Sequence, residues 1–217
     1  MISRFTDSNT NSTIYLFGGI KGLIRDGDEL RNLLIKTEPT TILIGISPEE
    51  LKGLSEFLKD PFELTLSDYE MIYGVILSSY GEVMTPAPIF TEALLYGEQH
   101  NVKMIALDMD EDKFGENFMN EIGTWSMIRH SVRKRRLMKK QFTGETAEEF
   151  VQQWNDNIEK IDGFRRIEQK RLDEMKHNFE QSMKSLVDQT AVVVIEYEKY
   201  MGMHQYMELL GLKPHNS

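Results

Sequence analysis

Charged side chains that could do chemistry follow the apolar runs that the sequence predicts to be strands. Asp108 and Asp110 belong to an acidic cluster after the run 102–107, and Glu196 and Lys199 follow a valine-rich run. Open α/β sheets hold their binding sites at the carboxyl ends of strands, so these residues are candidates for a site. A helix N-terminus, which favours negative charge, is the alternative interpretation of the acidic cluster.

Lys21 lies in a glycine-rich turn that follows the apolar run 13–17. Backbone N–H groups in such a turn are suited to binding an anion, which a lysine would neutralise. The Gly-Lys-Ser/Thr ending of a P-loop is absent, so a nucleotide-binding loop is not indicated. An exposed turn without a ligand is the alternative. The candidate ligand-binding residues are Gly18, Gly19, Lys21, Glu196 and Lys199, with Glu198 beside them.

A metal site in this chain would need histidine, aspartate or glutamate ligands, because the sequence contains no cysteine. Glu82, His100, Asp108 and Asp110 are the donors that could form one. A divalent ion such as manganese or cobalt would there activate water for hydrolysis. Alternatively, Glu82 lies in a turn and His100 at a solvated helix end.

The run 129–140 is the strongest concentration of positive charge, with Arg129, Arg133, Arg135 and Arg136 as candidate partner-binding residues. A basic helix of this kind suits an acidic protein, nucleic acid or an anionic membrane surface. A solvated helix facing the chain's own acidic helices is the alternative. The net charge of −10 argues against general nucleic-acid binding, which needs a surplus of lysine and arginine.

The elements that would position these residues are predicted from apolar patterning and helix caps. Continuous apolar runs are typical of parallel strands that are covered on both faces. Serine or threonine followed three residues later by glutamate has the spacing of a capping box. Such boxes are expected at Ser47 with Glu50, Ser67 with Glu70, and Thr146 with Glu149. Strands are expected at 13–17, 41–46, 102–107 and 190–195, and helices at 28–36, 48–60, 67–81, 86–100 and 203–210.

These elements predict an α/β fold of mixed type, with a small central mixed sheet flanked by helices. A long helical excursion of three helices is expected at 116–189, before the last strand. The 217 residues suit a single domain, 1–217. No run approaches the roughly 18 apolar residues of a membrane span, so we expect a cytoplasmic protein without membrane insertion. Exposed apolar helix faces would suggest a homodimer.

The order of these elements and motifs resembles the TraB/PrgY family, in a wider group with the TIKI metalloproteases and the erythromycin-esterase and ChaN-like folds. The segment 18–21 matches the family's Gly-x-x-His motif, with Lys21 in place of histidine. Gly45 stands where the family has a glutamate at a strand end, and 81–84 matches a Gly-x-Glu/Met element. Asp108 and the segment 170–175 match the later acidic and Glu-Arg motifs.

The resemblance implies that Glu82, Asp108 and Arg171 occupy catalytic positions, and that relatives hold a metal with the motif histidines and glutamate. Lys21 and Gly45 offer a cation no lone pair, so no metal cofactor is expected. We therefore expect a divergent, non-catalytic member that binds a peptide or a small anionic ligand in the former cleft. The alternatives are a metal-dependent hydrolase or peptidase with relocated ligands, and an interaction module that uses the basic helix.

Overall fold

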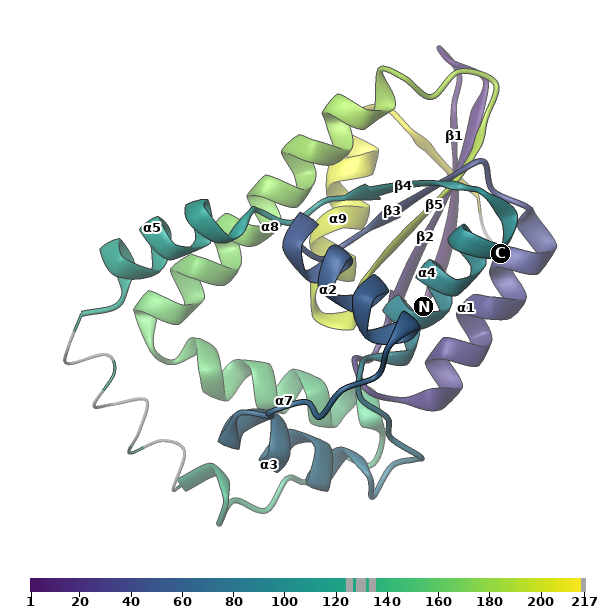
Figure 1. Cartoon of the computed structure of the whole chain (residues 1–217). Helices are drawn as coiled ribbons and strands as arrows, with labels where there is room; N and C mark the ends of the chain where they lie inside the picture. Colours follow the sequence, from purple (N-terminus) through teal and green to yellow (C-terminus); the bar gives the residue numbers. More distant parts are fainter. Residues whose placement is uncertain (124–126, 128–131, 133–135, 216–217) are drawn as a thin grey trace.

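A six-stranded mixed sheet forms the centre of the computed structural model, which describes residues 1–123, 127, 132 and 136–215 (Figure 1). The strand order is β4-β3-β5-β2-β1-β6. The strands are β1 (Ile2–Asp7), β2 (Ser12–Gly19), β3 (Thr41–Ile44), β4 (Lys103–Ala106), β5 (Thr190–Glu196) and β6 (Lys213–His215). Strands β4, β3, β5 and β2 pair in parallel, and β1 and β6 add antiparallel pairs at one edge. The predicted mixed α/β class is confirmed.

Helices cover both faces of this sheet (Figure 1). Helices α1, α2 and α4 contribute to one core cluster, and α8 and α9 contribute to the other. Helices α3 and α7 pack together beyond the carboxyl ends of the parallel strands. Their bounds are α1 (Ile24–Thr37), α2 (Pro48–Lys59), α3 (Asp68–Leu77), α4 (Pro88–His100), α5 (Glu111–Glu121), α7 (Ala147–Glu159), α8 (Asp162–Met183) and α9 (Tyr197–Leu209).

Strand β5 is the centre of the core because its residues are buried on both faces of the sheet. Val192 and Val194 pack into the cluster beneath α1 and α4, and Val193 and Ile195 pack into the cluster beneath α8 and α9. Alternate residues of a strand point to opposite faces, so a run of β-branched side chains fills both layers at once. Such two-sided burial is typical of parallel strands, and β5 pairs in parallel with both β2 and β3.

Two of the predicted capping boxes are complete. The backbone N–H of Glu50 donates to Ser47 Oγ at 3.0 Å, and the N–H of Ser47 donates to Glu50 Oε2 at 2.9 Å. Helix α3 begins with the same reciprocal pair. At α7 only half of the expected box forms, because the Glu149 carboxylate accepts from the N–H of Glu145 and not from that of Thr146.

Several predicted boundaries are wrong. Helix α5 begins at Glu111 and not at 116, because Asp110 caps it by accepting from the N–H of Lys113. Helix α4 begins at Pro88 rather than at 86, and α9 begins at Tyr197 rather than at 203. No side-chain cap bond marks the start of either helix, so the sequence carries no capping signal there.

Two strands, β1 and the edge strand β6, were not expected from the sequence. Strand β1 is mostly half-buried, with Phe5 as its one fully buried residue, so it lacks the continuous apolar pattern used to find strands. Strand β6 contains Pro214, and proline in a strand is confined to edges. The helical excursion precedes β5, but β6 follows β5, so the excursion does not precede the last strand. No helix among the described residues is long and apolar enough to cross a membrane.

Candidate functional site

A cavity of about 610 Å³ lies at the carboxyl edge of the parallel strands. One wall is apolar and aromatic and comes from α3 and α7, with Tyr73, Val75 and Trp154 among its residues. The opposite wall is charged and comes from the turn after β2, from α8, and from the junction of β5 with α9. A ligand that fills this cavity would contact both kinds of surface, so the site suits an amphiphilic molecule.

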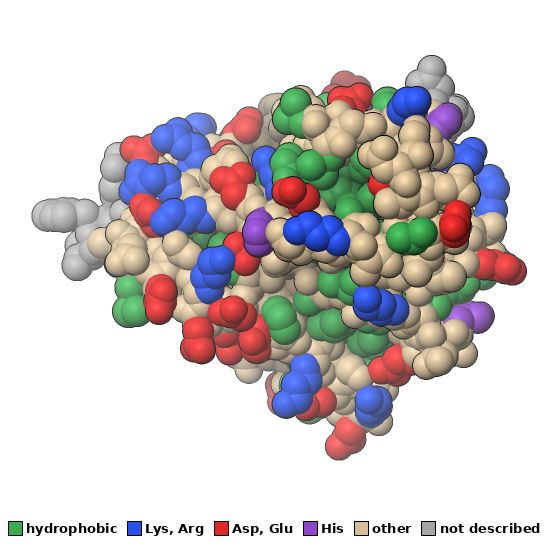
Figure 2. All heavy atoms as spheres, turned by 90° about the horizontal axis from the view of Figure 1, so that it is seen from above, with side chains coloured by type: hydrophobic (Ala, Val, Ile, Leu, Met, Phe, Trp, Pro, Cys, Tyr) green, Lys and Arg blue, Asp and Glu red, His purple; other side chains and the backbone are tan. Residues whose placement is uncertain are grey.

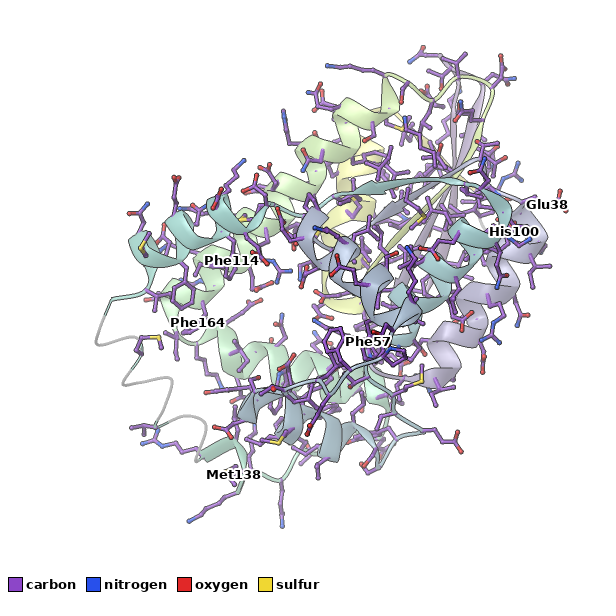
Figure 3. The ribbon with its side chains drawn as sticks, in the orientation of Figure 1. Glu38, Phe57, His100, Phe114, Met138 and Phe164 are labelled. Atoms are coloured by element: carbon purple, nitrogen blue, oxygen red, sulfur yellow. The ribbon has the colours of Figure 1, made fainter. Side chains whose placement is uncertain are left out.

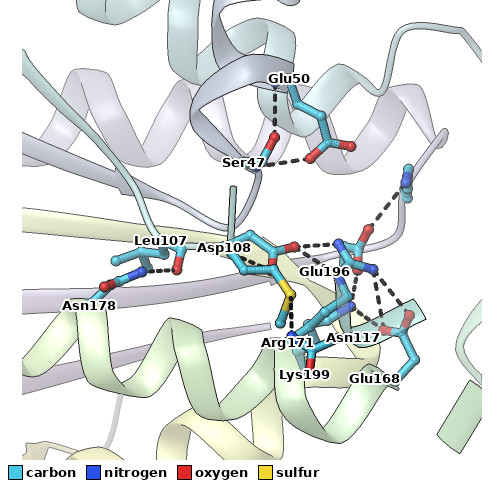
Figure 4. Close-up of polar contacts among 12 residues, drawn as sticks. Ser47, Glu50, Leu107, Asp108, Asn117, Glu168, Arg171, Asn178, Glu196 and Lys199 are labelled. Carbon is cyan, nitrogen blue, oxygen red and sulfur yellow. Dashed lines mark hydrogen bonds and ion pairs between the residues drawn. The ribbon is translucent and has the colours of Figure 1, made fainter. Parts of the chain in front are cut away.

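The charged wall is a chain of side chains of alternating sign (Figure 4). Lys21 Nζ lies 3.2 Å from Glu196 Oε1. The other oxygen of Glu196 accepts from Lys199 Nζ, which also lies 3.1 Å from Glu168 Oε2. Both oxygens of Glu196 are therefore used, and Lys199 is held between two carboxylates.

The charged wall continues from Glu168 to Arg171 and then to Asp108. Arg171 Nη1 lies 3.1 Å from Glu168 Oε1, and Arg171 Nε donates to Asp108 Oδ2 at 2.8 Å. Asp108 Oδ1 accepts from the backbone N–H of Met109 at 2.8 Å. The structure thus brings together five of the predicted site residues, with Glu168 as an additional member. Their functional role stays a prediction.

The topology explains why residues so distant in sequence meet. Lys21 follows β2 and Glu196 ends β5, and these strands are parallel neighbours with Gly19 opposite Glu196. Asp108 follows β4, so its position at the same edge comes from the parallel order of the sheet. Helix α8 passes this edge and supplies Arg171 from a position one turn after Glu168.

Pairing in the chain sets the ionisation of its members. Burial alone would raise the pKa of Glu196, but Lys199, Lys21 and Arg171 hold it well below its usual 4.5. Burial likewise opposes the charge of Glu168, and Lys199 and Arg171 outweigh it and lower its pKa. Burial disfavours the ammonium of Lys199, yet Glu196 and Glu168 raise its pKa. These groups are therefore charged at neutral pH.

Lys21 is the most accessible of the three cations in the charged wall. Its side chain is 50% exposed, whereas the side chains of Arg171 and Lys199 are 19% and 6% exposed. The attraction of Glu196 raises the pKa of Lys21 and outweighs burial. An ammonium group has three donors, and one carboxylate oxygen is its contact in the chain, so Lys21 retains donors for a ligand.

Glu198 lines the same cavity and is exposed to it. No salt bridge to its carboxylate is found among the described residues. Burial of the carboxylate and the negative charge of Glu196 raise its pKa above 4.5, and they outweigh Lys199 and Lys21, which lower it. Burial and the Glu198 carboxylate in turn raise the pKa of Tyr73, which places the two side chains in one electrostatic neighbourhood.

The predicted ligand-binding glycines have a packing role in the structure. A Cβ on Gly18 would lie 2.6 Å from Tyr200 Cδ2, and one on Gly19 would lie 2.7 Å from Ile89 Cγ2. The N–H of Gly18 donates to Met1 O at 2.9 Å, and the N–H of Ile20 donates to the Asp26 carboxylate. These two N–H groups are thus already used, and the anion-binding role of the turn stays a prediction. Within this segment, Lys21 is the residue that reaches the cavity.

The four residues proposed as metal donors are not brought together. His100 ends α4 beside Glu38 (Figure 3), and its Nδ1 lies 3.0 Å from Tyr96 O. It precedes β4, whereas Asp108 follows the other end of that strand. Asp110 caps α5. Glu82 is exposed in a loop, and its backbone carbonyl accepts from the N–H of Ile24.

Lys21 and Gly45, which the resemblance would place at metal positions, and the nearby Asp108 do not fit a metal. Lys21 presents an ammonium that pairs with Glu196, and the Asp108 carboxylate is bonded to Arg171. At Gly45 a Cβ would lie 3.0 Å from Ile195 Cγ2, so the backbone there is packed against β5. Among the described residues, no group of three or more acidic or histidine side chains is arranged to hold a metal ion.

The basic run is only partly covered by the described residues. Arg129, Arg133 and Arg135 lie outside them, and Arg136 is exposed. Among the described residues, the acidic residue Glu148 of α7 pairs with Arg25. On the face shown in Figure 2, acidic and basic side chains are interspersed, so charge there is locally balanced. The partner-binding role of the run and the expected homodimer stay predictions.

Glu168 was missed because it belongs to a long helical run rich in charge. Its signal was present, since it lies three residues before Arg171 and therefore on the same helix face. The aromatic wall has no distinct signal in the sequence, because periodicity does not distinguish a cavity wall from a core face.

Neither a family model nor a curated protein matches the chain.

Proposed function

We propose that this protein is a non-catalytic binding protein that holds a small amphiphilic ligand in the 610 Å³ cavity. The anionic group of the ligand lies beside Lys21, and its apolar body lies against α3 and α7. The half-exposed ammonium of Lys21 at the boundary of an apolar cavity is the observation that carries this proposal. The ligand class agrees with the small anionic ligand expected from the sequence.

The apolar wall supports this assignment. Helix α3 has a high apolar content, and Met71 and Val75 are 48% and 73% exposed while lining the cavity. Tyr73 also lines the cavity, and its ring packs against Phe150 and Trp154 of α7. An exposed apolar surface rimmed by charge is typical of a ligand-binding groove.

Glu196 and Asp108 are already bonded within the charged wall, which supports a binding role rather than catalysis. A nucleophile or general base needs a lone pair that is free to accept a proton from substrate or water. Both Glu196 oxygens and the Asp108 carboxylate are bonded to cations or to a backbone N–H. We further propose that the chain is a divergent TraB/PrgY-like protein, on the order of its strands and motifs.

Octanoate titrated into the purified protein by calorimetry tests the proposal. Lys21→Met should weaken octanoate binding about tenfold or more, since a hydrogen bond to a charged group contributes about 1.5–3 kcal/mol. Lys36→Met removes an exposed lysine of α1 and serves as the matched control, with no expected change. Val75→Asp should also weaken binding, because it places a carboxylate on the apolar wall.

Two results would contradict the proposal. Octanoate binding that is equal in wild type and Lys21→Met would remove Lys21 from the site. Turnover of a peptide in added manganese or cobalt, lost in Asp108→Ala, would replace a binding protein with a metal-dependent hydrolase.

A further inference from the structure

The cavity contains a second charged feature that an anionic ligand does not satisfy. Glu198 is exposed to the cavity, and among the described residues no salt bridge neutralises it. A purely anionic ligand bound beside Lys21 would meet the repulsion of this carboxylate. Lys199 and Lys21 offset part of its negative charge, but burial and the neighbouring Glu196 carboxylate outweigh them, so the pKa of Glu198 is raised.

Three aromatic side chains line the same cavity as Glu198, namely Tyr69, Tyr73 and Trp154. The ring centroids of Tyr73 and Trp154 are 5.4 Å apart, and those of Tyr69 and Trp154 are 6.3 Å apart, both in edge-to-face arrangements. A cation within about 6 Å of an aromatic centroid is attracted by the negative face of the ring. Several rings beside one carboxylate are the combination that recognises an alkylated ammonium group.

We propose that the Glu198 carboxylate and the rings of Tyr69, Tyr73 and Trp154 form a subsite for an alkylated ammonium group, so that the ligand is a zwitterionic amphiphile. This inference rests on the proposed function, because it assigns the second charge of the same ligand. The ammonium contacts the carboxylate and the aromatic faces, while the anionic group contacts Lys21. The apolar body lies in the cavity against α3 and α7.

The influence of Glu198 on its neighbours agrees with this arrangement. Burial and the Glu198 carboxylate raise the pKa of Tyr73, so the carboxylate and the phenol belong to one site. Burial and the charge of Glu196 raise the pKa of Glu198, so Lys199 and Lys21 compensate its negative charge only in part. A bound ammonium supplies that compensation.

Two probes of equal chain length separate the subsites. Octyltrimethylammonium and octanoate are titrated by calorimetry into wild type and Glu198→Gln. The substitution should weaken octyltrimethylammonium about tenfold, as expected for loss of a partly desolvated ion pair beside aromatic rings. The same substitution should leave octanoate binding equal or stronger, because it removes a repulsive charge. Lys21→Met should have the opposite pattern.

Control variants identify the source of the effect. Glu208→Gln removes a carboxylate from the same helix, α9, away from the cavity lining, and should change neither affinity. Tyr69→Leu retains an apolar side chain but removes an aromatic face, so it should weaken the ammonium probe and leave octanoate unchanged. This second variant keeps the test informative if Glu198→Gln fails to fold.

The outcomes distinguish the two proposals. Binding of octanoate without binding of octyltrimethylammonium would overturn the ammonium subsite and leave the proposed function standing. Equal affinity of octyltrimethylammonium for wild type and Glu198→Gln would also overturn the subsite. Failure of both probes to bind would overturn the proposed function and this inference with it.

Discussion

At the scale of single residues, the site depends on what each side chain is already bonded to. Glu196 and Asp108 use their oxygens within the charged wall, whereas Lys21 and Glu198 face the cavity with capacity left. The sequence indicated Lys21, Glu196 and Lys199 because they follow strand ends. It did not indicate which of them remain available, because that depends on partners supplied by α8.

Gly18 offers a test of packing at this scale. Gly18→Ala should lower the free energy of unfolding by about 1–3 kcal/mol, since the added methyl group would lie 2.6 Å from Tyr200 Cδ2 and overpack the core. Gly53→Ala is the matched control, because nothing lies within 4 Å of its Cβ position and alanine is the better helix former. Urea denaturation curves of the two variants measure the difference. A Gly18→Ala midpoint at or above that of wild type would refute the packing role.

At the scale of elements, capping signals predicted helix starts better than apolar periodicity did. Helices α2 and α3 begin one residue after Ser47 and Ser67, as their capping boxes predicted. Helix α9 has no side-chain cap bond and begins at Tyr197, well before the start inferred from its apolar residues. This difference matters for function, because the early start places Lys199 and Glu198 on the first turn of α9, beside the cavity.

Ser47→Ala tests the capping box of α2. The substitution should lower the free energy of unfolding by about 1 kcal/mol, because it leaves the backbone N–H of Glu50 without its acceptor. Ser8→Ala, in the exposed turn between β1 and β2, provides the comparison and should be nearly neutral. Thermal unfolding followed by circular dichroism measures both. Equal melting temperatures for the two variants would show that the box contributes nothing.

At the scale of the whole molecule, the charged wall joins parts of the chain that are far apart in sequence. Lys21 and Glu196 belong to the sheet edge, Asp108 follows β4, and Glu168 and Arg171 belong to α8. The apolar runs predicted β2, β3, β4 and β5 as strands of one sheet, but not their order. The sequence missed β1, which is only partly buried, and the edge strand β6, and it did not place α8 against the sheet.

Lys199→Met tests whether these ion pairs hold the molecule together. Breaking a buried pair leaves a carboxylate uncompensated, so at pH 7 the variant should lose about 3–5 kcal/mol of unfolding free energy. The pKa values of Glu196 and Glu168 are lowered in the folded state, so their contribution is present above pH 4.5 and lost as pH falls below it. The difference from wild type should therefore shrink in acid.

Denaturant titrations between pH 7 and pH 3 give the required free energies. Lys103→Met removes an exposed lysine at the start of β4 and should match wild type throughout. A Lys199→Met deficit that stays constant down to pH 3 would separate the loss of stability from the ionisation of these carboxylates.

The strand order has a consequence for biosynthesis. Strand β5 lies between β3 and β2, yet it follows both in the chain by the whole length of the helical excursion. A ribosome adds roughly 5–20 residues per second, so β2 and β3 wait roughly ten seconds for the partner that separates them. During that interval their apolar side chains and unpaired backbone groups are exposed without the strand that pairs with both. The nascent polypeptide is therefore most exposed to misassociation before translation reaches β5, and protection by chaperones matters most in that window.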